Sequence, residues 1–299
     1  MESGNIMKPM RFMKSGKAIL FAILAAVLYS LMTPLSKLLM VSVPPVAEAG
    51  LLYLGAGIGM GILYLAGWRL GRRTFGPSVD WSDLKYILAM IVLDMAAPVF
   101  LLLGLSMSTP ENVSLLNNFE IVATACVAAF FFHEKVGKRL AISICIITAA
   151  CILLSLESKE ALTFSTGSLF VLMACVCWGV ENNCTSSLSG KDTRQIVIIK
   201  GLGSGTASLI VSIFAGERID SLRQCIPILI LGFFSVGLSV YFYVMAQSRI
   251  GAARTSACYA VSPFIGAALS LLIFREPPGI HFWIALVFMA IGVWLNIGV

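Results

Sequence analysis

Long stretches of apolar residues recur along the whole of this 299-residue chain, and few of them contain a charge. A helix needs about 20 apolar residues to cross the hydrocarbon core of a bilayer. Soluble domains carry about 25% charged residues, whereas only 12% of this chain is charged. The pattern therefore predicts an all-α polytopic membrane protein. It disfavours a membrane β-barrel, whose strands alternate apolar with polar residues.

The apolar stretches divide the chain into ten expected transmembrane helices. Prolines at 44–45, 110 and 277–278 mark expected helix starts, where proline is tolerated. The connections between the stretches are too short to hold a soluble domain. The expected spans are 17–40, 44–66, 84–106, 110–132, 138–156, 166–188, 194–215, 225–247, 252–274 and 279–298.

Lysine and arginine residues favour one orientation of these spans, because cytoplasmic loops of membrane proteins are rich in them. If residues 1–16 form a basic cytoplasmic segment, 15 of the 21 Lys and Arg residues fall on the cytoplasmic side and five on the outer side. Lys200 remains inside a span. We therefore expect both termini on the cytoplasmic side of the cell membrane. The net charge of +6 then reflects attraction to anionic lipid headgroups and not to nucleic acid.

The chain lacks motifs for catalysis or cofactor binding. Its eight cysteines have no zinc-ligand spacing, and its two histidines, His133 and His281, lie at the ends of different spans. GLGSG at 201–205 lacks the Lys-Ser/Thr ending of a phosphate-binding loop and lies inside a span. We therefore expect no enzyme, no metal site and no cofactor.

The two halves of the chain resemble each other. FFFHEKVGKRLAISICIITAACILL at 130–154 is similar to LIFREPPGIHFWIALVFMAIGVWL at 272–295, and YLAGWR at 64–69 is similar to IFAGER at 213–218. We expect two repeats of five spans, 17–156 and 166–298. An odd number of spans places the second repeat upside down in the membrane. Inverted repeats are typical of secondary transporters, which bind substrate near the midplane between the halves.

The second half of each repeat carries a family resemblance. Residues 241–295, YFYVMAQSRIGAARTSACYAVSPFIGAALSLLIFREPPGIHFWIALVFMAIGVWL, show an aromatic-rich helix, a Gly-Ala turn, a helix with a central proline, a glutamate at its end and a glycine-containing last helix. The chain resembles the EamA family of the drug/metabolite transporter superfamily. Residues 101–154 fit less well, because Glu120-Ile121 stands where the second copy has Ser262-Pro263. The resemblance implies ten helices, with the fifth of each repeat at the outside, and alternating-access transport of small metabolites, often outward.

Asp94 and Glu120 are acidic residues near the middle of the third and fourth spans. A charge at the bilayer centre costs about 2.5–3.5 kcal/mol on insertion scales, so such residues face the protein interior or a water-filled path. Asn117, Glu120 and Thr124 share one helical face by their spacing. Because a tight turn joins the two spans, we expect them to pack as neighbours. The polar face is either a cavity with a protonatable carboxylate or a hydrogen-bonding clamp between helices.

Glu181 and Lys200 lie at similar depths, near the cytoplasmic ends of the sixth and seventh spans. An ion pair between them would reduce the cost of burying both. This pair is either static or broken during gating or substrate binding. Trp178 shares the helical face of Glu181.

Two further candidate residues, a predicted helix interruption and a helix-start carboxylate complete the polar features of the spans. Tyr259 and Ser262 match Asn117 and Glu120 in the other repeat, so they either line a cavity or pack helices closely. Asn182 and Asn183 point to other faces than Glu181 and match Thr33 and Pro34, so we expect both repeats to interrupt their first helix here. Glu48 follows Pro44-Pro45, and a carboxylate in the first turn suits the helix dipole, which indicates a structural role at the helix start.

The leading hypothesis is a secondary active transporter for a small-molecule substrate. Three intramembrane acids and one base tolerate a proton, a cation or a zwitterion better than a bare anion. The family resemblance favours amino acids and related amines, and export. Since no ATP-binding motif is present, coupling would use protons, another ion gradient or exchange. The alternative is a channel, scaffold or sensor without coupled transport.

Overall fold

The computed structural model describes residues 15–69, 77–131, 137–155, 165–186, 188, 191–219, 221–250, 258–276 and 278–297. Most of the expected basic segment 1–16 and the histidine and glutamate at 133–134 lie outside these ranges. Every regular element in the described ranges is helical. The helices are α1 (Ser15–Ser30), α2 (Met32–Leu39), α3 (Pro45–Arg69), η1 (Trp81–Asp83), α4 (Leu84–Ser106), α5 (Pro110–Leu116), α6 (Phe119–Phe131), α7 (Lys138–Ser155), α8 (Thr166–Ser186), α9 (Thr193–Phe214), α10 (Leu222–Gly232), η2 (Phe233–Leu238), α11 (Ser239–Ile250), α13 (Ser262–Phe274) and α14 (Ile280–Ile297).

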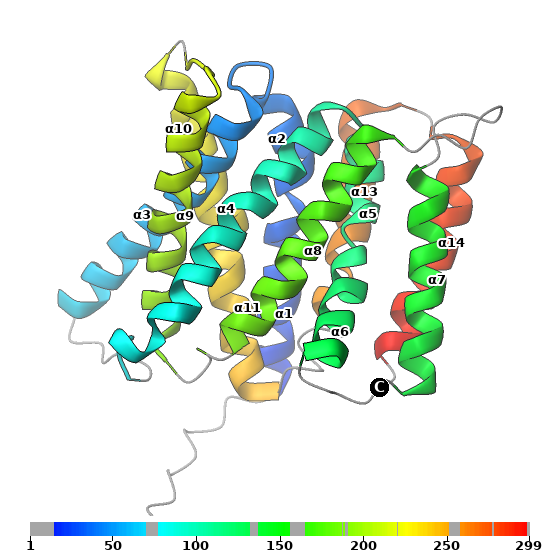
Figure 1. Cartoon of the computed structure of the whole chain (residues 1–299), viewed down its shortest axis with the longest axis horizontal. Coiled ribbons are helices and arrows are strands. Elements are labelled where there is room, and N and C mark those ends of the chain that lie inside the picture. The colour runs from blue at the N-terminus through cyan, green and yellow to red at the C-terminus, as the bar shows by residue number, and fades with distance from the viewer. Residues whose placement is uncertain are drawn as a thin grey trace, which may run out of the picture.

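Each predicted span contains at least one of these helices. Five helical segments of the described chain are long and apolar enough to cross a membrane, and three shorter segments are also apolar. The five long segments are Gly16–Leu39, Pro45–Gly67, Trp81–Ser106, Thr193–Phe214 and Leu222–Ala246. The helices form one elongated bundle, which we orient by Figure 1: the C-terminus marks its lower end.

Two spans predicted as single helices, the first and the fourth, are each broken in two, and a turn at 260–261 also interrupts the ninth ahead of α13. The first breaks between α1 and α2 at Leu31, because Pro34 lacks the N–H that would bond to the carbonyl of Ser30. The fourth breaks between α5 and α6 at Asn117–Asn118, where backbone bonds shorten to an i→i+3 pattern. Asn118 Nδ2 also donates to the carbonyl of Leu115 at 3.0 Å, and such side-chain bonds compete with the helical backbone.

The interruption expected at Asn182–Asn183 is absent, and this prediction is wrong. The helix α8 continues through Ser186. Asn183 Nδ2 donates to the carbonyl of Gly179 at 2.8 Å, one helical turn earlier. Asparagine keeps its backbone N–H, whereas the proline at the matching position 34 has none, so a break is favoured in the first copy and not in the second.

Glycines allow the centre of the bundle to pack closely. The helix α3 runs against α9, and a Cβ atom at Gly201 would lie 2.4 Å from the backbone nitrogen of Gly57. A Cβ at Gly205 would lie 2.6 Å from the nitrogen of Leu54. The helices α4 and α8 approach in the same way, since a Cβ at Gly104 would lie 2.7 Å from the carbonyl oxygen of Gly167. Small residues therefore set the spacing of the helices that carry the buried charges, as is common in membrane bundles.

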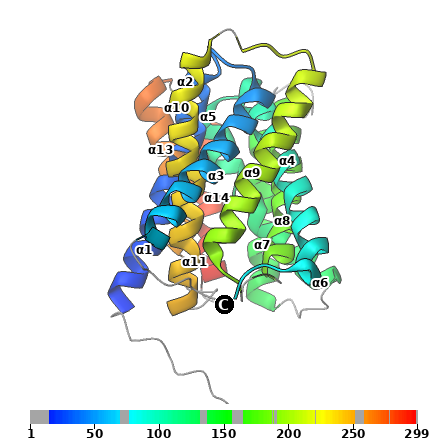
Figure 2. The ribbon, with the colours of Figure 1, turned by 90° about the vertical axis from the view of Figure 1, so that its left-hand side faces the viewer.

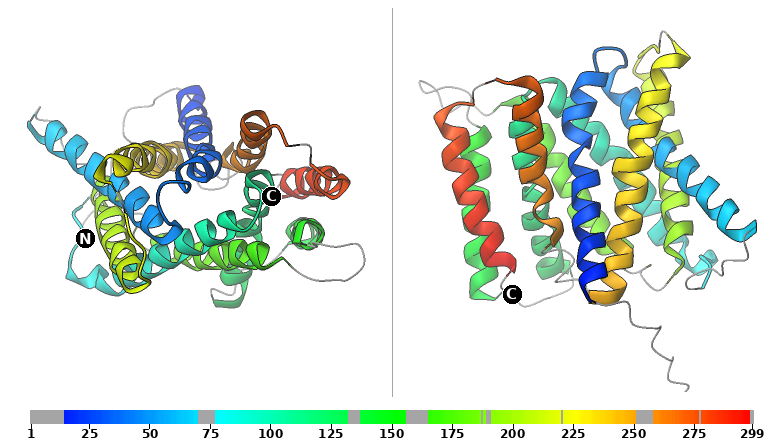
Figure 3. Two further views of the ribbon diagram at one scale, coloured as in Figure 1. Left: turned by 90° about the horizontal axis from the view of Figure 1, so that it is seen from above. Right: turned by 180° about the vertical axis from the view of Figure 1, so that it is seen from behind.

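The other helices pair around this centre. The helix α1 packs against α11, α5 against α13, α6 against α8, and α7 against α14. In Figure 2, α1, α10, α11 and α13 lie on one side of the bundle, and α4, α6 and α8 lie on the other. Seen from above in Figure 3, α7 and α14 form a pair at one edge. These two helices are the fifth of each expected repeat.

Candidate functional site

A buried lysine joins two carboxylates at the meeting of α4, α8 and α9. Lys200 Nζ lies 3.0 Å from Asp94 Oδ2 and 3.0 Å from Glu181 Oε1. The side chains of Asp94, Glu181 and Lys200 are 0%, 2% and 12% exposed. The expected pair of Glu181 with Lys200 is thus present, and Asp94 joins it. We call these three residues the lysine triad.

Hydroxyl groups hold both acids of the triad in place. Tyr53 Oη, on α3, donates to Asp94 Oδ1 at 3.2 Å. Thr185 Oγ1 donates to Glu181 Oε1 from one turn further along α8. The two carboxylates therefore have hydrogen bonds in addition to the shared cation, which reduces the cost of their burial.

Glu120 lies in another group of polar residues, at the contact between α6 and α8, which we call the Glu120 seam. Asn182 Nδ2 donates to Glu120 Oε1 at 2.7 Å and lies 3.4 Å from Thr124 Oγ1. Asn183 Nδ2 lies 3.4 Å from the carbonyl oxygen of Thr124. Gly179 permits this approach, because a Cβ there would lie 2.7 Å from Ala123 Cβ. The carboxylate of Glu120 interacts electrostatically with Glu181 and Lys200, so the Glu120 seam lies near the lysine triad.

The expected packing of the third span beside the fourth is only partly correct. The helix α4 contacts α5, the upper part of the fourth span, but its main partners are α8 and α9. The helix α6, which carries Glu120, packs on α8. A tight turn fixes only the ends of the helices it joins. Asp94 therefore meets Lys200, and Glu120 meets Asn182.

Four aromatic rings from separate segments gather next to Glu120. Tyr29 on α1 lies 6.5 Å from the Trp178 ring and 5.7 Å from the Tyr259 ring, measured between centroids. Tyr243 on α11 lies 5.0 Å from Tyr259. Tyr29 and Tyr259 both interact electrostatically with Glu120. Aromatic faces attract cations within about 6 Å of the ring centre, so this group can bind a positively charged ligand together with a carboxylate.

Two predicted site residues lie apart from these groups in their contacts. Asn117 is buried at the break between α5 and α6, where its backbone carbonyl is 3.9 Å from the Cys175 thiol. Ser262 is 1% exposed, and within the described chain its hydroxyl has no hydrogen-bond partner. Neither residue contacts the lysine triad through a described hydrogen bond. Their roles in a site remain predictions.

Six residues of the triad, the Glu120 seam and the aromatic group were not among the predicted site residues. They are Tyr29, Tyr53, Asn182, Asn183, Thr185 and Tyr243. A tyrosine inside an apolar span has a single polar group, its hydroxyl, and its ring is equally suited to core packing. Asn182 was adjacent to Glu181 and was assigned to another face. That assignment was correct, since it is this other face that meets α6.

Glu48 lies in the first turn of α3 as predicted, but its carboxylate makes no hydrogen bond to the start of the helix. The free N–H groups at the start of α3 are taken by Glu217, which accepts from Val46 at 3.2 Å and from Ala47 at 2.7 Å. Glu48 is fully buried, and both of its carboxylate oxygens are without a hydrogen-bond partner among the described residues. The helix N-terminus thus attracts a carboxylate as expected, but one that is distant in sequence.

A surface ion-pair cluster ties two loops together at the lower end. Lys191 Nζ lies 2.9 Å from both Asp80 Oδ2 and Asp83 Oδ2. Hydrogen bonds from Ser82 and then Lys191 lower the pKa of Asp80 to about 2. The hydrogen bonds to Asp83 and Asp80 raise the pKa of Lys191. This cluster links the start of α4 to the start of α9, the two helices that supply Asp94 and Lys200.

The chain is similar to known proteins along nearly its whole length. The model of the EamA-like transporter family matches residues 16–156 and again 165–298, which together span nearly the whole chain. The chain belongs to the EamA-like transporter family. An uncharacterized transporter of Methanothermobacter thermautotrophicus is 25% identical over 289 residues, covering 91% of this chain and 84% of that protein. The uncharacterized transporter YyaM of Bacillus subtilis is 24% identical over 258 residues, covering 78% and 84%.

A solved structure shows the same fold. One protein of known crystal structure matches with a TM-score of 0.67, covering 94% of this chain and 96% of the other, at 18% identity. At that identity the likeness concerns the fold alone. This EamA-family chain is therefore a multi-pass membrane transporter, and the lysine triad and the Glu120 seam are its candidate functional groups.

Proposed function

We propose that the protein is a secondary active transporter that exports small cationic or zwitterionic metabolites, with amino acids and related amines as the expected class. The observation that carries this proposal is the group of three acids and one base buried within the bundle. Lys200 offsets only one of the charges of Asp94, Glu181 and Glu120 when all are ionised. The aromatic rings of Tyr29, Trp178, Tyr243 and Tyr259 add a surface suited to cations.

We infer ten spans in two inverted repeats, 17–156 and 166–298. Exchanging the two repeats maps the pairing of α4 with α8 onto that of α11 with α1. It likewise maps α6 with α8 onto α13 with α1, and α3 with α10 onto α9 with α4. The two separate matches of the family model also support two repeats. Alternating access would then arise from movement of one repeat against the other.

We further propose that the lower end of the bundle faces the cytoplasm. In Figure 1, α1 begins and α14 ends at this end, which suits an even number of spans. The excess of Lys and Arg in the segments assigned to this side supports the orientation. The membrane would be the cell membrane.

Glu120 is our candidate for proton coupling or for binding the cationic group of the substrate. Its partner Asn182 is exposed in the structure, and Glu120 itself is half-buried. A carboxylate and an amide facing lipid would be costly, so we propose that they line a water-filled path. Intramembrane carboxylates in such places serve as proton relays in transporters.

The experiment uses purified protein in liposomes, with radiolabelled amino acids and amines. Transport should saturate and show counterflow, which a channel would not show. Glu120→Gln keeps the shape and the hydrogen bond from Asn182 but removes the charge, so it should fold and abolish the pH dependence of transport. An unchanged pH profile in Glu120→Gln would mean that this carboxylate is a packing clamp.

A further inference from the structure

A pocket lies at the upper rim of the bundle, away from the lysine triad. It has a volume of about 240 Å³ and is formed where α5 and α14 begin and α7 ends. The pocket therefore sits beside the edge pair of α7 and α14, whereas the lysine triad lies on α4, α8 and α9. The lining residues on which the argument depends are Thr109, Glu111, Leu154, Glu276 and Phe282.

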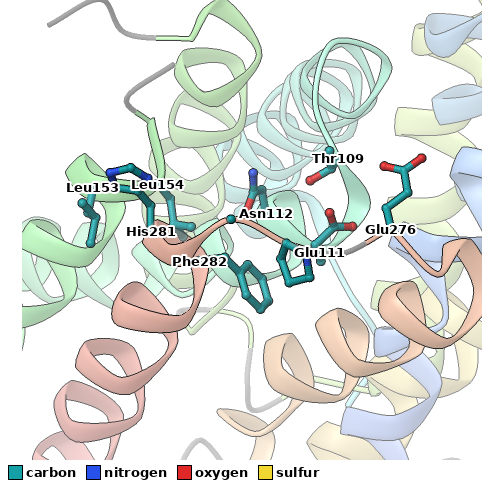
Figure 4. Close-up of a pocket in the computed structure, with 10 residues that line it drawn as sticks. Thr109, Glu111, Asn112, Leu153, Leu154, Glu276, His281 and Phe282 are labelled. Carbon is teal, nitrogen blue, oxygen red and sulfur yellow. The ribbon is translucent and has the colours of Figure 1, made fainter. Parts of the chain in front are cut away.

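The lining of this rim pocket is divided by chemistry. Figure 4 shows Thr109, Glu111 and Glu276 on one side, and Leu153, Leu154 and His281 on the other. Phe282, which is 3% exposed, adds an aromatic ring between them. The pocket thus offers a group of oxygen acceptors at one end and an apolar surface at the other.

Glu111 is the central feature of the acidic side. It is 4% exposed and lines the pocket, yet no hydrogen bond or ion pair reaches its carboxylate from the described residues. The hydroxyl of Thr109 is also buried without a partner in that part of the chain. A buried hydroxyl without a partner is costly, because it loses its hydration and gains no hydrogen bond in return, and the Glu111 carboxylate beside it faces the pocket. A ligand with several N–H donors would satisfy both groups.

The nearby lysine does not satisfy them. Lys37 Nζ donates instead to two backbone carbonyls, of Leu105 at 2.5 Å and of Ser108 at 2.9 Å. It lies close enough to Glu111 and Glu276 to interact with them electrostatically, but it is in ion-pair distance of neither. With one lysine beside two glutamates, the pocket keeps an excess negative charge.

We propose that the rim pocket binds a primary ammonium group attached to an apolar body. The three N–H donors of the ammonium would bond to Glu111, Glu276 and Thr109, and the apolar body would lie on Leu154 and Phe282. A metal ion is a poorer match, because the described chain contains no group of three or more metal-binding side chains. The ammonium belongs either to a soluble amphipathic amine or to the headgroup of phosphatidylethanolamine, since the pocket lies at the end of the bundle.

The test measures thermal unfolding of the full-length protein in detergent with benzylamine, and with benzyl alcohol as the neutral analogue. Benzylamine should raise the unfolding temperature, because a ligand that binds the folded state stabilises it, and benzyl alcohol should not. Glu276 lies in an exposed connection, so Glu276→Gln should fold normally. Glu276→Gln and Glu111→Gln should each weaken benzylamine binding about 10-fold to 100-fold, as expected for the loss of a charged hydrogen-bond partner.

Asp80→Asn is the matched control, because it removes a carboxylate from the surface cluster at the lower end, outside both sites. Its benzylamine affinity should equal that of the natural protein. Loss of binding in Glu120→Gln with retention in Glu276→Gln would place the amine at the aromatic group and overturn the proposal. Equal stabilisation by benzyl alcohol would overturn it as well. Because Glu276 lines the rim pocket and not the Glu120 site, the dependence of binding on Glu276 does not rest on whether the protein transports amines.

Nanodiscs decide between the two sources of the ammonium. The affinity for benzylamine is measured in phosphatidylcholine alone and with phosphatidylethanolamine added. If the lipid headgroup is the ligand, phosphatidylethanolamine should weaken benzylamine binding to the natural protein. If the affinity is the same in both, the pocket binds soluble amines. Either result supports the ammonium site, provided that binding depends on Glu276.

Discussion

The lysine triad and the Glu120 seam lie on either side of the same helix, α8, but their carboxylates are neutralised in different ways. Asp94 and Glu181 share the cation of Lys200 and are almost completely buried. Among the described residues, the close partner of the Glu120 carboxylate is the side-chain amide of Asn182, and Asn182 is exposed. An acid held by a buried cation must lose an ion pair before it can bind a ligand. Glu120 needs only to exchange one neutral hydrogen bond, so it is the more available group.

The largest effect should follow from removing the shared cation. Lys200→Ala leaves two buried carboxylates without a counter-ion, which should lower the free energy of unfolding by about 3–5 kcal/mol. Combining it with Glu181→Gln should recover part of this loss, and adding Asp94→Asn should recover more. Thermal unfolding in detergent measures the series. Equal stability of Lys200→Ala and the double variant would show that Glu181 and Lys200 do not depend on each other.

Neutralising one acid of the lysine triad and, separately, Glu120 compares the two groups directly. Asp94→Asn should cost about 1.5–3 kcal/mol of unfolding free energy, since a hydrogen bond to a charged group is lost. Glu120→Gln should cost less than about 1 kcal/mol, because its amide oxygen still accepts from Asn182. Both are measured by unfolding under identical conditions. If Glu120→Gln proved the more destabilising of the two, Glu120 would be the structural clamp and the comparison would be reversed.

Removing a hydroxyl that supports the triad should have a smaller effect. Tyr53→Phe deletes the donor to Asp94 Oδ1, and loss of this bond should cost about 0.5–1.5 kcal/mol of unfolding free energy. Tyr29→Phe is the control, because its hydroxyl makes no hydrogen bond among the described residues and its ring contacts are kept. Similar unfolding temperatures for the two variants would mean that Tyr53 contributes only through packing.

The smallest effect should come from the surface cluster at the lower end. Because the pKa of Asp80 is lowered to about 2 in the folded protein, its contribution is fully present above the ordinary value of about 3.9. It is lost as the pH falls toward about 2. Asp80→Asn should therefore change the unfolding temperature slightly at neutral pH, and less so in high salt, which screens exposed charges. A large change that salt does not reduce would mean that the cluster is a structural lock between α4 and α9.

Much of the helical framework could be predicted from the chain alone. The expected starts at 84, 110 and 138 agree with α4, α5 and α7. The length of an apolar stretch and the position of a proline are local properties, so they set helix boundaries independently of how the helix packs. The breaks were harder to place. Pro34 favours a break through its missing N–H but does not require one, since Pro98 lies inside the continuous helix α4. Asn117 and Asn118 favour a break only weakly, and at Asn183 the helix continues.

The candidate site, too, could be predicted from the sequence only in part. Glu181 and Lys200 could be paired in advance because both lie near the same end of consecutive helices, so their depth follows from residue counting. The third member, Asp94, could not be assigned, because its partner depends on which side of α4 faces α9. Glu48 shows the same limit. Its position after two prolines predicted a role at the helix start, but the free N–H groups there donate to Glu217, which follows the neighbouring helix α9.

The sequence by itself determined that this chain is an all-helical membrane protein, that its apolar stretches repeat in two halves, and that a few charges must be buried. These follow from local composition, since lipid admits neither free backbone groups nor unpaired charges without a large cost. Only the tertiary structure decided which charges meet. Close contacts between glycine backbones hold α3 against α9 and α4 against α8. In this packing Asp94 forms an ion pair with Lys200, and Glu120 accepts a hydrogen bond from Asn182. Ion pairs and hydrogen bonds act over a few ångströms, and only the packing of distant segments sets distances at that scale.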